Sequence, residues 1–120
     1  MTDKLQLGQL GERLAAEYLT KKGYQIIAKN YSTRGGEIDL ICQKDKVFHF
    51  IEVKTRTNQK FGWPEEAVTD EKLEKIIMAS EKYCQEYDLN SEWQIDIISI
   101  LINQATRIAE LRHLKNIAIT

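Results

Sequence analysis

Two segments that read as buried β-strands each carry charged residues, and these charges constrain the fold of the chain more than any other feature. Residues 36–41 read Gly-Glu-Ile-Asp-Leu-Ile, and residues 50–56 read Phe-Ile-Glu-Val-Lys-Thr-Arg. Burying a carboxylate without a partner is costly, so such groups are usually exposed, paired with a cation or bound to a metal ion. The function depends on which of these three situations applies here.

The two segments are close enough in the chain to form an antiparallel hairpin. The pattern predicts strands at residues 37–43 and 47–55, with a polar turn, Lys-Asp-Lys, at residues 44–46. We expect a loop with an even number of residues, either 45–46 or 44–47. The loop length fixes which residues of the two strands face each other.

With an even loop, two pairs of charged residues face each other across the hairpin. Asp39 lies opposite Glu52, and Glu37 lies opposite Lys54. Like charges placed directly opposite destabilise a strand pair unless a positive group lies between them. We therefore expect a divalent cation between Asp39 and Glu52, and we expect Glu37 to neutralise Lys54.

Side chains alternate between the two faces of a strand. We therefore expect Asp39 and Ile41 on one face, Ile38 on the opposite face, and Phe50 together with Glu52 on the facing strand. The apolar neighbours favour two central strands, where a stray charge is costly. The alternative is a solvated charged surface with ordinary cross-strand pairs, because such charged triplets are frequent by chance.

The predicted charges suit one kind of chemistry. Two converging carboxylates fit Mg²⁺ or Mn²⁺, which prefer oxygen ligands and keep positions open for water and phosphate. Lys54 follows Glu52 by two residues and so points toward the same site. There it could orient or help deprotonate a water molecule and offset charge on a phosphate in the transition state. The predicted reaction is phosphodiester hydrolysis.

The remaining pattern predicts an α/β domain spanning residues 1–120. Leucines at helical spacing predict a helix over residues 4–22, ended by Gly23. A strand at 25–31 precedes the hairpin, and a loop at 56–66 follows it. We then expect a second amphipathic helix with its apolar stripe from Leu73 to Tyr87, and two strands at 93–102 and 105–114 around a turn at Asn103-Gln104. The order α-β-β-β-α-β-β favours a mixed sheet flanked by helices.

The overall charge excludes some functions. The net charge of −1 argues against a protein that coats nucleic acid through general positive charge, although it leaves room for a local basic site. No apolar signal core or membrane-length segment is present, so we expect a cytoplasmic protein. Cys42 and Cys84 have no metal-binding spacing and are expected to be reduced.

The loop after Lys54 mixes cations with aromatic residues. Arg56 and Lys60 could grip phosphates, while Phe61 and Trp63 could stack on unpaired bases. The alternative is a surface loop whose aromatic rings pack back onto the core. Lys72, near the start of the second helix, could likewise donate to a phosphate or simply be solvated.

Two histidines complete the candidates. His49 falls on the apolar face of its strand and is expected to be a hydrogen-bonded core residue rather than a ligand. His113 is expected to be structural as well. Neither has a neighbouring signature of nucleophilic catalysis.

The two charged segments together resemble the signature of the PD-(D/E)XK nuclease superfamily, and more closely the small bacterial YraN family. The likeness extends over nearly the whole chain. It rests on combined motifs: Gly8 to Glu12, Tyr18-Leu19, Gly23, Asn30-Tyr31, Arg34, Phe61-Gly62, Lys72 and Asp96.

The YraN family is similar to archaeal Holliday-junction resolvases, which implies a restriction-endonuclease-like fold. By this resemblance Glu12 joins Asp39 and Glu52 around Mg²⁺ or Mn²⁺, Lys54 is the catalytic lysine, and Arg34 contacts nucleic acid. It also implies DNA, branched or otherwise structured, as the partner, and a homodimer.

Ser32 and Gln94 stand where relatives tend to carry arginine. These departures remove positive charge that could have touched DNA. A second hypothesis is therefore a nucleic-acid-binding or assembly module that keeps the fold with little catalysis. A third is a structural protein whose charges are paired on its surface.

Overall fold

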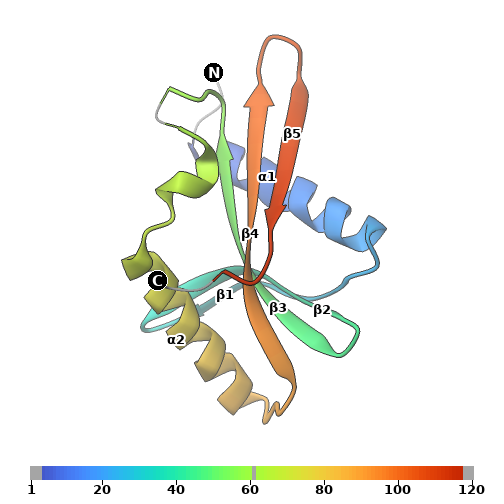
Figure 1. The fold of residues 1–120 in the computed structure, drawn as a ribbon, viewed down its shortest axis with the longest axis vertical. Helices are drawn as coiled ribbons and strands as arrows, with labels where there is room; N and C mark the ends of the chain where they lie inside the picture. Colours follow the sequence, from blue (N-terminus) through green and yellow to red (C-terminus); the bar gives the residue numbers. More distant parts are fainter. Residues whose placement is uncertain (1–3, 61, 118–120) are drawn as a thin grey trace.

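The computed structural model describes residues 4–60 and 62–117. The predicted element order is confirmed, with one short 3₁₀ helix, η1, added in the long loop (Figure 1). The elements are α1 (Lys4–Lys21), β1 (Gln25–Thr33), β2 (Gly36–Lys44), β3 (Val47–Arg56), η1 (Pro64–Ala67), α2 (Asp70–Glu86), β4 (Glu92–Asn103) and β5 (Ile108–Leu114). No helix in the described part of the chain has the length and hydropathy needed to cross a bilayer.

The five strands form one mixed sheet in the order β1-β2-β3-β4-β5. β3 and β4 are parallel and are connected through α2, whereas the other neighbouring strands are antiparallel. β2 and β3 are therefore interior strands, as their apolar residues predicted. The charged residues of the hairpin lie in the middle of the sheet.

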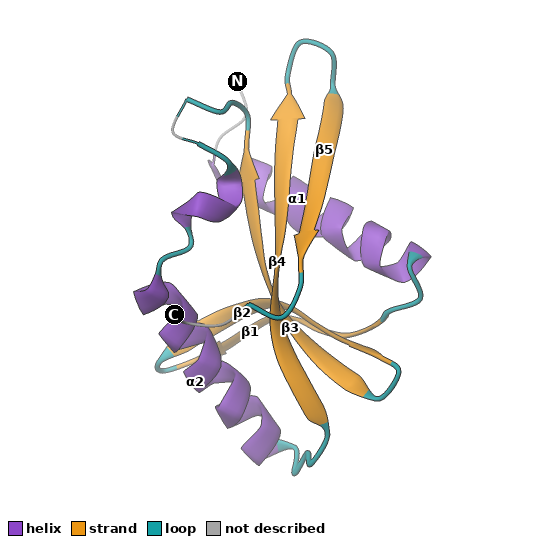
Figure 2. Ribbon diagram, in the orientation of Figure 1, coloured by secondary structure: helices purple, strands orange, loops and turns teal. Residues whose placement is uncertain are grey.

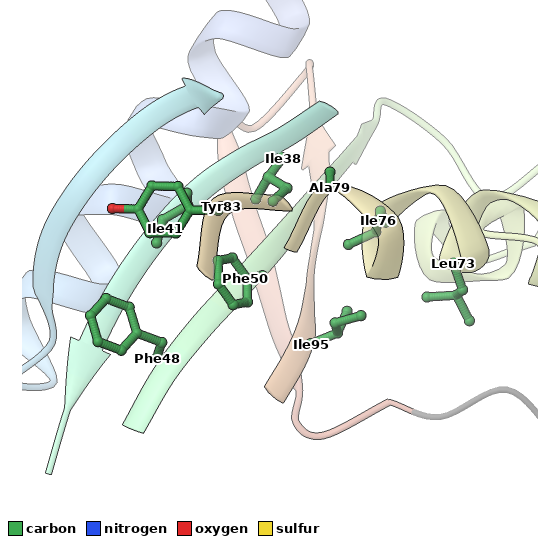
Figure 3. Close-up of a cluster of buried hydrophobic side chains, with 9 residues drawn as sticks. All are labelled: Ile38, Ile41, Phe48, Phe50, Leu73, Ile76, Ala79, Tyr83 and Ile95. Atoms are coloured by element: carbon green, nitrogen blue, oxygen red, sulfur yellow. The ribbon is translucent and has the colours of Figure 1, made fainter. Parts of the chain in front are cut away.

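The helices cover opposite faces of the sheet (Figure 2). On one face, Leu73 and Ile76 of α2 pack with Phe50 and Ile41 in the cluster drawn in Figure 3. On the other face, Ala15 and Leu19 of α1 pack against aliphatic residues of β2, β3 and β4: Leu40, Ile51, Ile98 and Ile100. Burial of these apolar side chains is the main driving force for the fold.

The helix ends are fixed by local sequence. After α1, Gly23 has a φ of 92°, and the N–H groups of Gly23 and Tyr24 donate to the carbonyls of Thr20 and Leu19. This is the glycine-ended cap that the sequence predicted. At the start of α2, Thr69 Oγ1 accepts a hydrogen bond from the backbone N–H of Lys72.

The predicted hairpin register is confirmed. Asp45 and Lys46 form a two-residue turn, and both have positive φ, 51° and 68°, as a type I′ turn requires. The pairs run from Lys44 opposite Val47 to Leu40 opposite Ile51. Asp39 and Glu52 are the next residues in this register, one step beyond the last pair.

The predicted alternation of β2 is wrong at Ile38, which packs with Ile41 on the α2 face (Figure 3). The cause lies in the neighbouring strand β1. Asn30, which would face Asp39, has a φ of 52°, and the β1–β2 ladder skips this position. A distorted ladder no longer keeps strict alternation of side chains.

The predicted start of the last strand at residue 105 is also wrong. The side-chain oxygen of Asn103 accepts hydrogen bonds from the N–H groups of Ala105 and Thr106, and Arg107 has a φ of 60°. These contacts close a tight turn that delays β5 until Ile108.

Gly11 allows α1 to approach β3 closely, and substitution there should disturb the packing. A Cβ at this position would overlap Thr55 Oγ1 and lie 3.0 Å from Thr55 Cβ. We expect Gly11→Ala to lower the free energy of unfolding by about 1–3 kcal/mol. Chemical denaturation measures this change.

The control lies one helical turn earlier. A Cβ on Gly8 would meet no atom within 4 Å, so Gly8→Ala should be neutral or slightly stabilising. Equal stability of the two variants would contradict the close contact. Thr55→Ala in the Gly11→Ala chain should recover part of the loss.

Candidate active site

The candidate site lies where β2 and β3 separate. Their pairing ends at Leu40 and Ile51, although both strands continue. Just beyond this point, the backbone N–H of Val53 donates to Asp39 Oδ2 at 2.8 Å. The Asp39 side chain thus bridges the two strands where their ladder stops, and it lines a cavity.

The cavity has a volume of about 670 Å³ and is formed by β3, the start of α1 and the Asp39 region of β2. The structure therefore brings together all four residues that were predicted to be catalytic. Its charged lining residues are Lys4, Glu12, Asp39, Glu52, Lys54 and Arg56.

Glu12 reaches the cavity because α1 packs tightly on β3. Its neighbour Gly11 is buried against Thr55, the residue after Lys54. Partial burial raises the pKa of Glu12, and the charges of Glu37 and Glu52 add to this effect. A hydrogen bond from Asn30 acts in the opposite direction. The negative charge of Glu52 thus contributes to the raised pKa of Glu12.

Asp39 is the most strongly perturbed acid of the site. Burial, followed by the negative charge of Glu52, raises its pKa to about 7. The hydrogen bond from the N–H of Val53 only partly offsets this rise. The repulsion between Asp39 and Glu52 that the register predicted is therefore present, and a bound cation would relieve it.

Lys72 is the ion-pair partner of Glu52, a contact that we did not predict. Its Nζ lies 2.8 Å from Glu52 Oε1, and Glu52 is only 5% exposed. The two residues come from α2 and β3, so local sequence gives no signal for their contact. Lys72, predicted as a phosphate ligand, thus also balances the charge of a buried carboxylate.

The two lysines of the site influence each other. Burial lowers the pKa of Lys54, and a hydrogen bond with Lys72 and its charge lower it further. Burial also acts to lower the pKa of Lys72, but its hydrogen bonds with Glu52 and Lys54 raise it overall. Lys54 is therefore the lysine that loses its proton more readily, which suits a group that moves protons.

A smaller cavity of about 130 Å³ opens on the α2 side of the same carboxylates. Glu37 and Lys75 line it together with Asp39, Glu52 and Lys72. The start of β2 lies against α2 here, since a Cβ on Gly36 would lie 2.6 Å from the carbonyl oxygen of Lys75. Asp39 and Glu52 thus form the wall between two cavities.

The predicted pairing of Glu37 with Lys54 is wrong. β2 and β3 have already separated at these positions, and Glu37 lies opposite Ser32 of β1 instead. The charge of Glu37 still acts on the site, since it contributes to the raised pKa of Asp39 and of Glu12.

The donor set fits a hard divalent cation in an open site. Within the described residues, no three His, Cys, Asp or Glu side chains are placed closely enough to form a metal cage. Mg²⁺, however, is commonly held by one or two carboxylates and keeps several waters. Asp39 and Glu52 each use one oxygen in the contacts above and can offer the other.

The model of the uncharacterised protein family UPF0102 matches residues 11–100, which include both charged segments. The chain belongs to this family. It is 43% identical over 112 residues to a UPF0102 protein of Syntrophomonas wolfei, which covers 92% of this chain and 96% of the relative. Identity to a relative from Caldanaerobacter subterraneus is 38% over 116 residues, or 95% of each chain. The expected YraN-type family is thereby confirmed.

Four basic side chains of this UPF0102 chain were predicted to contact nucleic acid, and two of them lie at the site. Arg56 lines the large cavity, and its Nη1 donates to the carbonyl of Thr55. Lys72 lines the small one. Arg34, in the β1–β2 turn, and Lys60, in the following loop, are exposed and line neither cavity.

The aromatic residues of the loop were predicted either to stack on bases or to pack on the protein. Trp63 packs on the protein, because the guanidinium of Arg112 lies 4.3 Å from the centre of its ring. Arg112 also pairs with Glu65, and Glu65 accepts a hydrogen bond from Ser99. Phe61 lies outside the described residues.

A second polar cluster was not predicted. Asp96 is fully buried, and its Oδ2 accepts hydrogen bonds of 2.8 Å from His49 and from His113. Its Oδ1 accepts from the Gln94 side chain and the Asn116 backbone. The expectation that His49 is a hydrogen-bonded core residue is confirmed, and His113 is hydrogen-bonded in the same cluster. Nothing local in this UPF0102 sequence links the three residues, since they are far apart in the chain.

Proposed function

We propose that this UPF0102 chain is a metal-dependent endonuclease that hydrolyses DNA phosphodiester bonds. The observation that carries the proposal is the arrangement of Asp39, Glu52 and Lys54 around one cavity, with two mutually repelling carboxylates. The resemblance to the PD-(D/E)XK superfamily, with its restriction-endonuclease-like fold, supports it. By the same resemblance, the substrate is branched or otherwise structured DNA.

The residues have distinct roles in this proposal. Asp39 and Glu52 would hold Mg²⁺ or Mn²⁺, and Glu12 would add a third carboxylate from α1. When bound, such a cation lowers the pKa of water and neutralises charge on the phosphate. Lys54 accepts the proton of the attacking water or donates to a phosphate oxygen.

Two further basic side chains, Lys72 and Arg56, have roles in the proposed reaction. Lys72 keeps the Glu52 carboxylate oriented through their 2.8 Å contact. Arg56, at the edge of the large cavity, binds a neighbouring phosphate.

A second candidate function is a nucleic-acid-binding or assembly module with little catalysis. The contact between Lys72 and Glu52 favours it, because the ammonium competes with a metal ion for the same carboxylate. The net charge of −1 favours weak binding of nucleic acid as well.

Incubation with DNA separates the two functions. The chain is mixed with a four-way junction, a flap and a linear duplex in Mg²⁺ or Mn²⁺, beside a Glu52→Ala variant purified in parallel. The proposal predicts cleavage by the wild-type chain alone. Binding without cleavage would favour the second function, and cleavage that persists in the variant would indicate a contaminant.

Lys54 should be needed for the reaction but not for metal binding. We expect Lys54→Met to slow hydrolysis by about 10²–10⁴-fold, because it removes the group that moves the proton. Mn²⁺ binding, measured by calorimetry, should persist in this variant. Unchanged hydrolysis would exclude the assigned role.

A further inference from the structure

β5 forms an open edge of the sheet. It is the last strand in the sheet order, and no described strand pairs with its outer side. Figure 2 shows α1 crossing behind the sheet rather than running along this edge. After β5 the chain turns back to β4, where the N–H of Ile117 donates to the carbonyl of Ile95 at 2.7 Å. As far as the described residues 4–60 and 62–117 go, the outer backbone groups of β5 thus remain available for another strand.

The opposite edge, β1, is unsuited to such pairing. Its ladder shifts between Ile26 and Ala28, and Asn30 has a φ of 52°. Bulged edges of this kind resist addition of a further strand. β5 has no positive φ between Ile108 and Leu114 and pairs regularly with β4 along its whole length.

We infer that the β5 edge is the surface through which two copies of this chain associate, as antiparallel strands about a two-fold axis centred on Leu111. When a two-fold axis runs perpendicular to the sheet through a central residue, the two copies of the strand pair symmetrically about it. A residue a given number of positions before the centre then faces the residue the same number of positions after the centre in the other copy. Centring on Leu111 pairs all seven residues of Ile108–Leu114.

Charge decides between this register and its neighbours. With Leu111 at the centre, Glu110 of each copy faces Arg112 of the other, which gives two attractive cross-strand pairs. A centre at Glu110 or at Arg112 would oppose like charges. The ion pairs found among the described residues do not include Glu110, and the Arg112 side chain is 43% exposed despite its contact with Glu65.

The same register covers an exposed apolar residue. Ile108 is 67% exposed in the single chain, and in the pair it faces Leu114 of the other copy. A seven-residue ladder buries less than the roughly 1,000 Å² of a stable interface. We therefore expect a reversible dimer with a dissociation constant on the order of 10–100 μM.

Sedimentation equilibrium of the full chain tests the inference. The wild-type mass should rise with concentration from 13.9 kDa toward twice this value. Glu110→Lys should weaken the dimer by about 10-fold or more, because it places like charges opposite each other. Glu81→Lys, the same charge change at an exposed position of α2, should have no effect.

Mixing two variants provides the strictest arm. Arg112→Glu alone should weaken the dimer to a similar extent, but its equimolar mixture with Glu110→Lys should dimerise like the wild type, since each anion then faces a cation. Circular dichroism checks that both variants fold. A wild-type chain that stays monomeric up to about 500 μM, or a Glu110→Lys chain that associates like the wild type, would overturn the inference.

Discussion

Replacing Glu52 with glutamine is expected to slow DNA hydrolysis by about 10²–10³-fold. The substitution keeps the shape of the side chain but removes the charge that would bind the cation. It also leaves the ammonium of Lys72, which lies beside Lys54, without an anionic partner. Loss of one preorganised charged group in an active site has effects of this size. Initial rates on a labelled branched DNA measure the effect.

The control for Glu52→Gln is the same substitution at Glu17, an exposed residue of α1. Glu17→Gln should cleave at the wild-type rate. Equal rates for both variants would mean that the buried carboxylate has no part in the reaction.

Replacing Asp96 with alanine is expected to lower the free energy of unfolding by about 3–5 kcal/mol. The substitution leaves the donors of His49, His113, Gln94 and the Asn116 backbone without an acceptor inside the protein. A buried donor without a partner is more costly than the lost hydrogen bond itself. Urea denaturation measures the change, and Asp88→Asn at an exposed position is the control.

The contribution of Asp96 should depend on pH. Burial acts to raise its pKa, but hydrogen bonds from His113 and His49 outweigh burial and hold the pKa well below its ordinary value of 3.8. The stabilisation is therefore complete above pH 4 and decreases as the pH falls below it. Wild-type stability should fall more steeply between pH 4 and pH 2.5 than that of Asp96→Asn. Parallel curves would contradict this ionised, hydrogen-bonded state.

The hairpin could be predicted because its determinants are local. A two-residue turn fixes the register, and the register places Asp39 next to Glu52 without any knowledge of the rest of the fold. The helix end at Gly23 was equally accessible, since one residue with positive φ determines it. Local rules sufficed at this turn and this cap, but not at the turn between β4 and β5, where the predicted strand began too early.

Errors arose where strands deviate from a regular ladder. The prediction for Ile38 assumed strict alternation along β2, which the distorted β1–β2 ladder breaks at Asn30. The predicted pair of Glu37 and Lys54 assumed that β2 and β3 remain paired along their full length. The pairing of these strands ends at Leu40 and Ile51, and residues just beyond this point line the cavity. The feature that makes the site is thus the one that regular strand geometry cannot predict.

Contacts between distant segments could not be predicted either. Lys72 contacts Glu52 because α2 packs on one face of the sheet, over β3. Asp96 contacts His49 and His113 because β3, β4 and β5 are neighbours in the sheet. Such contacts depend on how the elements pack, which single-strand patterns do not contain.

Calorimetric titration with Mn²⁺ tests the central claim most directly, because it requires neither a substrate nor turnover. The wild-type chain should show saturable binding that is lost in Asp39→Asn and in Glu52→Gln and kept in Glu17→Gln. Binding that is absent from the wild type, or that persists unchanged in both site variants, would contradict a metal site at these two carboxylates.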